Sequence, residues 1–359
     1  MSTHMVERPG RPRRVLTIIL WIGAAAVILG VLIPVGLITL QRQALATTRT
    51  AHPAPGRLVE VGGYRMHIHC EGESEPGGPT VVIVAGDADF SLDWMPIQDR
   101  LAALYRVCVY DRAGYGWSDP RPEPRDADHV VEELHSLLVA ADEREAVLLV
   151  GHALGGVTTR LYAARYRDDV AGLVLVDAVT DYVQTDVYAA QQRKLLGSYE
   201  VTRFMVGSGI SRVLTPIAGE RALPPAARAL PQDLQSAYRG LLLDPAYYET
   251  AIAELQLAQT SVEQANAALV GEAPLGDLPL IVLTAAQTSP AGAGPDGAGR
   301  VPASAVVIQE QGALTLLSED SERRMLGRSG HQVHLDEPDA ILSAVDDVYA
   351  NIMTGTRVR

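Results

Sequence analysis

The longest hydrophobic run of the chain lies close to its N-terminus. No charged residue occurs from Val15 to Leu40, and residues 1–14 carry four arginines against one glutamate. With a helical rise of about 1.5 Å per residue, this run extends over about 39 Å and crosses a hydrocarbon core of about 30 Å with some tilt. Pro34 would disrupt a water-exposed helix but is tolerated in a membrane span. We therefore predict a basic tail at residues 1–14 and a transmembrane anchor at residues 15–40.

The arginines also set the expected orientation, because positive charges that flank a span stay in the cytoplasm. The rest of the chain is then extracytoplasmic, after a linker rich in Thr, Ala and Pro at residues 41–56. The alternative is a cleaved signal peptide and a domain secreted after cleavage near Ala46, since Ala44-Leu45-Ala46 has the small residues of a cleavage site. Signal-peptide apolar cores are only about 7–15 residues long, which favours the uncleaved anchor.

Beyond residue 56, short apolar runs alternate with segments of helical periodicity. Residues 58–61 and 64–70, separated by Gly62-Gly63, predict an antiparallel hairpin. The following apolar runs are almost continuous, which is typical of parallel strands buried on both faces. Strands are expected at residues 80–85, 107–110, 146–150, 172–177 and 278–284, crossover helices at 97–104 and 128–138, and a closing helix at 338–353. This order predicts an α/β fold with a mostly parallel sheet.

The turn after residues 146–150 carries the most informative motif, Gly151-His152-Ala153-Leu154-Gly155-Gly156. A strand, a sharp glycine-flanked turn and a helix form the setting of the nucleophile elbow, G-x-S-x-G, but the apex here is Ala153. Upstream stands Tyr110-Asp111-Arg112-Ala113-Gly114-Tyr115-Gly116-Trp117-Ser118, and downstream stands Gly330-His331-Gln332-Val333-His334, ahead of Pro338. In this order the three motifs resemble the α/β-hydrolase superfamily, over roughly residues 57–352.

The resemblance implies an α/β-hydrolase fold, with a mostly parallel eight-stranded sheet, flanking helices and a helical cap over the active site. The Ala-, Leu- and Gln-rich segment at residues 182–275, which prolines interrupt, matches such a cap. We therefore expect the first part of the hydrolase core at residues 57–181, the cap at 182–275 and the second part of the core at 276–359.

The resemblance also implies a set of site residues. In this family a serine attacks the substrate, a histidine takes its proton and a carboxylate orients the histidine, in the chain order Ser, acid, His. By position, Ala153 stands where the serine is expected and His331 is the base. The loop after residues 80–85 supplies one N–H of the oxyanion hole near Asp87, and Leu154 supplies the other.

Three carboxylates are candidates for the acid. The strand that most often precedes it ends at Thr284, but no carboxylate follows before Asp296. Some family members carry the acid after the preceding strand, where Asp177 stands and Asp181 follows. We favour Asp177, with Asp181 and Asp296 as alternatives. The nearby histidines at positions 152 and 334 are expected to be structural, and the loop at residues 111–112 is expected to brace the elbow.

Ala153 decides the mechanism, because a methyl group cannot form an acyl-enzyme. The chain is an esterase- or lipase-like hydrolase inactivated at its nucleophile, or it uses His331 to activate water. The second case resembles the aminoacrylate hydrolase of pyrimidine breakdown, which has the same Gly-His-Ala-Leu-Gly elbow. We expect a hydrolase of small ester- or amide-like substrates. The alternative is a catalytically inactive pseudoenzyme that binds a small apolar ligand in the capped pocket.

Composition and charge limit the classes of partner that the chain is expected to bind. Of 359 residues 47% are apolar, which is ample for a large core, and the net charge of −13 argues against nucleic acid, whose binding needs clustered Lys and Arg. We expect a small-molecule substrate or ligand and the membrane as partners, and we predict no cofactor or metal site. The two cysteines, Cys70 and Cys108, fall on neighbouring strands of the family fold. An oxidising compartment permits a bridge between them, although directly paired strand positions often have poor geometry for one.

Overall fold

The fold is built on one large sheet. The computed structural model describes residues 11–121, 124–143, 146–218, 223–228, 230–288, 301–302 and 305–358. Its strands follow the order β1-β2-β4-β3-β5-β6-β7-β10. β2 pairs antiparallel with β1 and β4, and the remaining pairs are parallel. The bounds are β1 Arg57–Val61, β2 Tyr64–Glu71, β3 Thr80–Val84, β4 Val107–Tyr110, β5 Val147–His152, β6 Val170–Val176, β7 Leu280–Ala285 and β10 Ser321–Leu326. The predicted mostly parallel, eight-stranded sheet is confirmed.

β3, β4, β5 and β7 are buried along their whole length, because helices cover both faces of this sheet. One face packs against α3 Ala127–Ala140, α4 Gly155–Arg165 and α10 Ala258–Ala268, and the other against α2 Ser91–Leu101 and α13 Pro338–Thr354. The helix expected at residues 97–104 is α2, which begins earlier than expected, at Ser91, and ends at Leu101. Its start is fixed by Asp93, whose carboxylate accepts the N–H of Phe90 at 3.0 Å.

β10 was not predicted, because its sequence is polar. It lies at the edge of the sheet beside β7. Around it lie α11 Ala305–Ala313 and the short α12 Val333–Asp336, and a separate two-stranded sheet pairs β8 Gln287–Thr288 with β9 Val301–Pro302. The segment after β7 thus contains short strands, and its residues 289–300 lie outside the described part of the chain.

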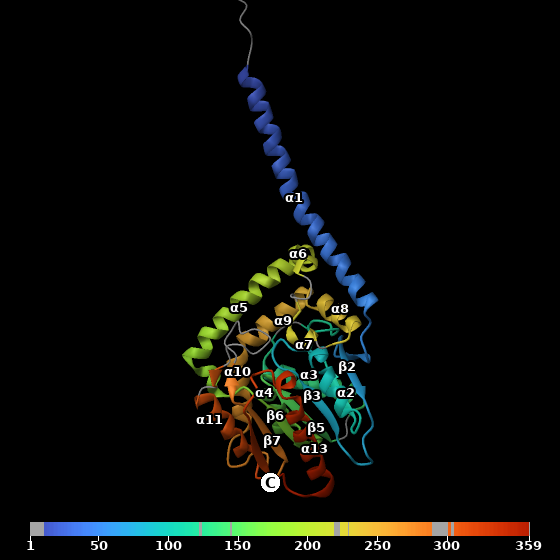
Figure 1. Cartoon of the computed structure of the whole chain (residues 1–359), viewed down its shortest axis with the longest axis vertical. Coiled ribbons are helices and arrows are strands. Elements are labelled where there is room, and N and C mark those ends of the chain that lie inside the picture. Colours follow the sequence, from blue (N-terminus) through green and yellow to red (C-terminus); the bar gives the residue numbers. More distant parts are fainter. Residues whose placement is uncertain are drawn as a thin grey trace, which may run out of the picture.

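The cap lies over one end of the sheet, between the sheet and α1 (Figure 1). It contains α5 Asp186–Gly207, α6 Ile210–Ala218, α7 Pro225–Arg228, α8 Gln232–Leu241 and α9 Pro245–Gln256. An apolar cluster joins it to the core, where Phe90 packs against Tyr238 and Tyr247 with ring centroids 4.7 and 6.2 Å apart. α10 belongs to the core instead of the predicted cap, because Val262 and Ala265 are buried with the residues of α3 and α4.

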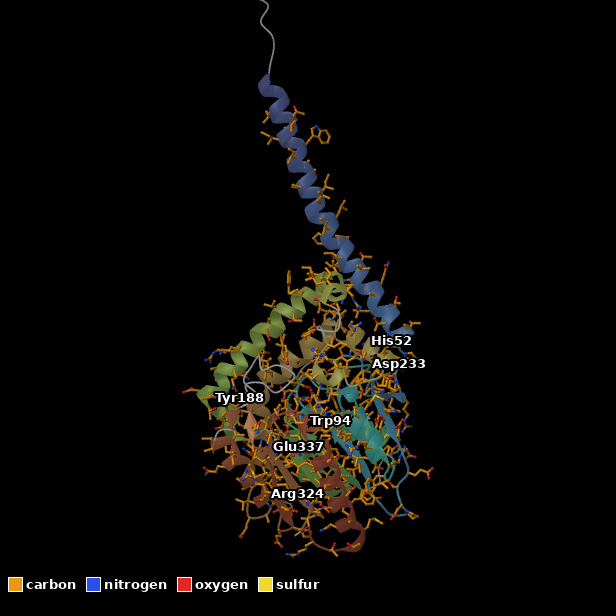
Figure 2. The ribbon with its side chains drawn as sticks, in the orientation of Figure 1. His52, Trp94, Tyr188, Asp233, Arg324 and Glu337 are labelled. Carbon is orange, nitrogen blue, oxygen red and sulfur yellow. A yellow bond between two sulfur atoms is a disulfide. The ribbon has the colours of Figure 1, made fainter. Side chains whose placement is uncertain are left out.

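The N-terminal helix α1 runs without a break from Arg11 to Ala51. Its upper part is long and apolar enough to span a membrane, and Figure 2 shows side chains there pointing away from the rest of the molecule. The linker expected at residues 41–56 is wrong for residues 41–51, which continue the helix. These residues are rich in Ala, Gln and Arg, which favour helices, and they contact the cap. Gln41 donates to the carbonyl of Leu243 at 2.6 Å, and Arg49 pairs with Asp244 at 3.5 Å.

A disulfide joins the two antiparallel strands at one side of the sheet. Cys70 of β2 and Cys108 of β4 are direct cross-strand partners, with Cα atoms 4.0 Å apart, and their sulfurs are bonded. The proposed bridge is therefore present at a directly paired position, where poor geometry had been the objection.

Candidate functional site

The turn between β5 and α4 has the backbone of a nucleophile elbow. Ala153 lies at its apex with φ +49°, in the left-handed region that residues other than glycine rarely adopt. Its N–H donates to the carbonyl of Val176 at 3.1 Å, which ties the turn to β6. Gly155 permits close packing on β3, since a Cβ there would lie 2.2 Å from the carbonyl oxygen of Val84. The turn that would present a nucleophile is formed, but it carries a buried methyl group.

His331 and Asp177 lie beside each other on the loops that follow β10 and β6. His331 Nδ1 is 2.7 Å from Asp177 Oδ2. The other carboxylate oxygen accepts the N–H of Ala285 at 3.2 Å and the side-chain amide of Gln311 at 2.9 Å. Burial raises the pKa of Asp177, but the hydrogen bond and charge of His331 outweigh burial, so the pKa lies below its ordinary value. The carboxylate is therefore held ionised and in a fixed orientation.

The same contact perturbs His331. Burial lowers its pKa, and the hydrogen bond to Asp177 together with that residue's charge outweighs burial, which raises the pKa to about 9. Its side chain is 45% exposed and lines a large cavity. Within the described part of the chain, Nε2 has no hydrogen-bond partner. The imidazole thus has one nitrogen bound to a carboxylate and the other available to a substrate or to water.

The other two candidate acids do not contact this histidine in the described structure. Asp181 is exposed and accepts hydrogen bonds from Asn266 at 2.7 Å and from Gln184 at 3.3 Å. Asp296 lies outside the described residues. Of the two candidates that the structure describes, Asp177 is the one that lies within hydrogen-bond distance of His331.

Two backbone N–H groups beside the elbow are available as oxyanion donors. Among the described residues, nothing accepts a hydrogen bond from the N–H of Asp87 or of Leu154. The loop at residues 86–90 is held by Arg112, which donates to the carbonyls of Ala85 and Gly86, both at 2.7 Å. Arg112 thus braces the loop that carries Asp87, whereas the sequence analysis expected residues 111–112 to brace the elbow.

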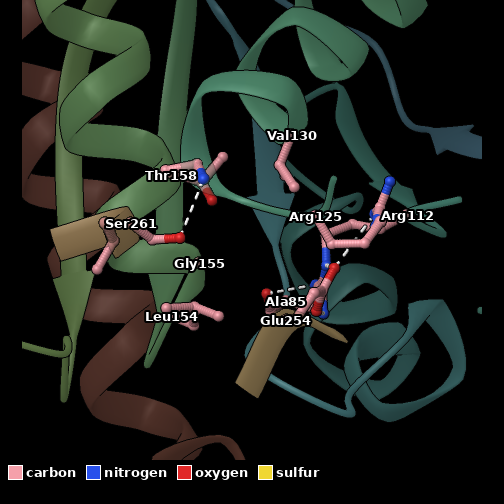
Figure 3. A pocket seen from close by; sticks show the side chains of 11 residues that line it. Ala85, Arg112, Arg125, Val130, Leu154, Gly155, Thr158, Glu254 and Ser261 are labelled. Carbon is pink, nitrogen blue, oxygen red and sulfur yellow. Dashed lines mark hydrogen bonds and ion pairs between the residues drawn. The ribbon is translucent and has the colours of Figure 1, made fainter. Parts of the chain in front are cut away.

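Arg112 also connects this loop to the cap. It pairs with Glu254 of α9 at 3.1 and 3.0 Å, and Arg125 reaches the same carboxylate at 3.2 Å (Figure 3). All three side chains are buried, so loss of one would leave an uncompensated charge. The network borders a cavity of about 10 Å³, which has room for about one water molecule, next to Leu154. Cap and oxyanion loop are therefore mechanically coupled.

A second carboxylate–histidine contact lies behind the base. His152 Nδ1 is 3.1 Å from Asp89 Oδ2, and His152 Nε2 is 2.9 Å from the carbonyl oxygen of His331. His152 therefore bridges the loop at residues 86–90 and the loop that carries His331. His334 packs between Trp94 and His152, with ring centroids 4.7 and 5.5 Å away, and burial lowers its pKa to about 3. A neutral, buried ring at this position supports the packing of the site.

The large cavity beside His331 lies between the core and the cap and has a volume of about 710 Å³. Its cap wall is aromatic and polar, with Tyr199, Tyr247 and Tyr248 among the lining residues. Its core wall carries carboxylates of the oxyanion loop. Asp87 has no hydrogen-bond or ion-pair partner among the described residues and raises the pKa values of His331 and Tyr199 through its charge. The cavity therefore combines aromatic surface with negative charge.

Comparison with known proteins identifies the family. A family model described as alpha/beta hydrolase fold matches residues 79–200. The protein YqjL of Bacillus subtilis (strain 168) is 31% identical over 202 residues, which are 52% of this chain and 79% of that protein. The chain belongs to the alpha/beta hydrolase family.

Two further likenesses agree with this membership. The putative carbamate hydrolase RutD of Cronobacter sakazakii is 38% identical over 104 residues, which cover 28% of this chain and 38% of that protein. The structure of a putative lipase from Acinetobacter baumannii AYE superposes with a TM-score of 0.59 over 88% of this chain and 97% of that chain, at 16% identity, which shows the fold alone. Of three other curated relatives, the chain spans 20%, 28% and 46%.

In this alpha/beta hydrolase several supporting residues escaped the sequence analysis. Gln311, which holds Asp177, and Glu254, which anchors the oxyanion loop, come from helices distant in sequence, and no local motif marks them. Asp89 follows the strand at residues 80–85 within the expected oxyanion loop, so its position carried a usable signal. Among the described residues, one group could approach a metal, Cys70, Cys108 and Glu143, but its sulfurs are bonded to each other and cannot act as thiolate ligands.

Proposed function

We propose that the chain is a membrane-anchored hydrolase of small ester- or amide-like substrates in which His331, oriented by Asp177, activates water in place of a serine. The observation that carries the proposal is the 2.7 Å contact between His331 Nδ1 and the Asp177 carboxylate, with Nε2 left without a partner among the described residues. A carboxylate at Nδ1 holds the tautomer that accepts a proton at Nε2. Loss of the serine therefore leaves a base that can serve water directly.

The reaction follows from these groups. Neutral His331 takes a proton from water at Nε2 as the oxygen attacks the carbonyl carbon, and the carbonyl oxygen becomes an oxyanion. The N–H groups of Asp87 and Leu154 donate to that oxyanion. When the tetrahedral intermediate collapses, the imidazolium returns the proton to the leaving oxygen or nitrogen as its bond to carbon breaks. Asp177 remains ionised throughout and stabilises the imidazolium.

The carboxylates close to His331 favour neutral or cationic substrates. The carboxylate of Asp87 lacks a cationic partner among the described residues, and that of Asp89 is kept ionised because its hydrogen bond to His152 outweighs burial and lowers its pKa. A substrate carboxylate would be repelled from such a site. Arg228 also lines the cavity, so the repulsion of an anionic substrate is confined to the carboxylates close to His331. The likeness to the putative carbamate hydrolase RutD supports a small amide-like group at the reacting carbon.

The proposed location is extracytoplasmic, with residues 1–14 in the cytoplasm and α1 as an uncleaved anchor. The basic N-terminal tail supports this orientation, since arginines remain on the cytoplasmic side. The Cys70–Cys108 disulfide supports an oxidising compartment for the domain.

The second candidate is a binding protein without catalysis. It is favoured by Ala153 and by the raised pKa of His331, because a protonated imidazole cannot act as a base. In that case the cavity holds a small ligand and the elbow is a remnant.

Kinetics on neutral esters and carbamates from pH 6 to 10 separate the two. For the hydrolase, the rate of the unaltered chain should rise with pH to a midpoint near 9, and His331→Ala and Asp177→Asn should abolish it. His135→Ala, a histidine stacked on Tyr166 outside the cavity, is the matched control and should keep the rate. A rate that survives His331→Ala, or ligand binding with no turnover at any pH, would contradict the hydrolase proposal.

A further inference from the structure

A second cavity lies between the anchor helix and the cap, apart from the site described above. It has a volume of about 440 Å³ and is walled by α1, α6 and α8. Its lining includes two arginines, Arg212 of α6 and Arg239 of α8, together with the hydroxyl groups of Thr48, Thr215 and Ser236. None of these residues contributes to the proposed reaction.

The two guanidinium groups are incompletely satisfied. Arg212 donates from Nε to Gln41 Oε1 at 2.9 Å, but its Nη2 is buried without an acceptor. The Nε of Arg239 is buried without an acceptor as well, and Arg239 makes no hydrogen bond or ion pair with any described residue. A buried charged donor atom is costly unless it is paired, and among the described residues no anion of this cavity accepts from these two nitrogens.

The neighbouring groups do not supply that acceptor. The hydroxyls of Thr48, Thr215 and Ser236 donate to carbonyls of their own helices at 2.9, 2.7 and 3.1 Å. The carboxylate of Asp244 is paired with Arg49 and accepts the N–H of Ala246 at 3.0 Å. The guanidinium forks remain as the donors, and their planar geometry suits the oxygens of a phosphate group.

The position of the cavity relative to the span adds a second observation. Gln41, the partner of Arg212, is the first polar residue after the uncharged run that ends at Leu40. The turn between α5 and α6 rests on α1 one helical turn earlier, because Gly209, with φ +80°, approaches so closely that a Cβ there would lie 2.3 Å from the carbonyl oxygen of Leu37. Figure 1 shows α6 at the end of the domain that faces the upper part of α1. Arg212 thus lies where the span meets water.

The cap presents apolar side chains at this same end. On α6, Ile217 is 81% exposed, and it shares a helical stripe with the exposed Val213 and Leu214. On α5, Phe204 is 69% exposed, and Val201 one turn before it is exposed as well. An amphipathic helix with an exposed apolar face beside a membrane span is suited to lie in the bilayer interface.

We propose that the cavity between α1, α6 and α8 binds the phosphate group of an anionic lipid, with Arg212 and Arg239 as the guanidinium donors and the apolar faces of α5 and α6 resting in the same leaflet. A free phosphate ion offers the same oxygens, but its binding would not explain the exposed apolar side chains of α5 and α6. The lipid therefore accounts for both observations.

The test uses the full chain in nanodiscs of phosphatidylcholine, with phosphatidylglycerol added in steps and thermal unfolding of the domain as the readout. A ligand that binds the folded state raises the unfolding temperature in proportion to its affinity. Phosphatidylglycerol should raise this temperature for the unaltered chain. The Arg212→Gln/Arg239→Gln double variant should require at least about tenfold more of the lipid for the same shift, because charge-assisted hydrogen bonds are lost.

Two further variants make the result specific. Arg239→Gln alone removes no hydrogen bond or ion pair with a described residue, so we expect it to fold, and it should also weaken the response. Arg203→Gln is the matched control. It removes the same charge from an exposed arginine of α5 that pairs with Glu200, and it should leave the response intact. An equal response in all variants would reduce the effect to general membrane charge and overturn the proposal. No response of the unaltered chain, or equal protection by inorganic phosphate in phosphatidylcholine nanodiscs, would overturn the lipid assignment.

Discussion

Replacing Ala153 with serine is the most direct test of whether the elbow still belongs to a working site. The apex already has φ +49°, so the substitution asks for no change of backbone. The new Oγ would stand at the position of a serine nucleophile, with His331 and Asp177 already 2.7 Å apart and the N–H groups of Asp87 and Leu154 available. We therefore expect Ala153→Ser to convert the site to covalent catalysis.

The size of the gain can be estimated from two quantities. Loss of a complete triad costs about 2 × 10⁶ in turnover, which bounds the gain from restoring it. Because the pKa of His331 is raised to about 9, the histidine is neutral in only about one molecule in a hundred at pH 7. Both forms need this neutral, proton-accepting imidazole, so its fraction cancels from their ratio. The rate of each form should rise as pH passes through about 9, and the gain from Ala153→Ser is at most about 10⁶ at every pH.

The assay is hydrolysis of short-chain nitrophenyl esters by both forms from pH 6 to 10, with burst kinetics to detect an acyl-enzyme. Ala153→Ser in a His331→Ala background is the control and should show no burst. A gain below about tenfold at every pH would refute the reasoning, because it would mean that base and oxyanion donors are out of register. The same gain in the control background would refute the assigned role of His331.

Three further predictions follow from separate features. Asp87→Asn should shift the midpoint of the pH profile below 9, because the charge of Asp87 raises the pKa of His331, and an unshifted profile would contradict this coupling. Replacing Cys70 and Cys108 with serine opens a loop of 38 residues and should lower the free energy of unfolding by roughly 3–4 kcal/mol, measured by urea denaturation, and equal stability with and without the bridge would count against it. Protease added to intact cells should digest the domain, and protection until lysis would reverse the proposed orientation.

Much of the fold was predictable because apolar runs leave few choices. Strands such as β3 and β5 are apolar except for Thr80 and His152 at their ends, and buried parallel strands require such a pattern. β10 was missed for the opposite reason. β10 lies at the edge of the sheet, where a strand need not be buried on both faces, and it carries the charged residues Glu322, Arg323 and Arg324. The linker was misassigned because its composition resembles a flexible segment, whereas contacts of Gln41 and Arg49 with the cap stabilise a helix there.

The candidate site, like the fold, has parts that the sequence predicted and parts that it did not. His331 and Ala153 stand in local motifs, so their places followed from sequence order. Asp177 was favoured over its alternatives because some members of the family carry the acid after this strand, and the structure places it next to His331. The groups that hold these residues could not be predicted, because Gln311 and Glu254 reach the site only through the packing of α11 and α9. Such long-range contacts leave no spacing to detect.

In the proposed membrane-anchored arrangement, the unbroken course of α1 determines how the domain reaches its proposed substrates. A flexible tether would let the domain tumble and sample the volume around its attachment point in every direction. A helix bonded to the cap at Gln41 and Arg49 transmits the tilt of the span to the whole domain instead. The cavity then keeps a constant height and a constant facing above the bilayer. Encounters become a two-dimensional problem in which lateral diffusion in the membrane, more than rotation of the domain, sets how often the cavity and a membrane-associated substrate meet.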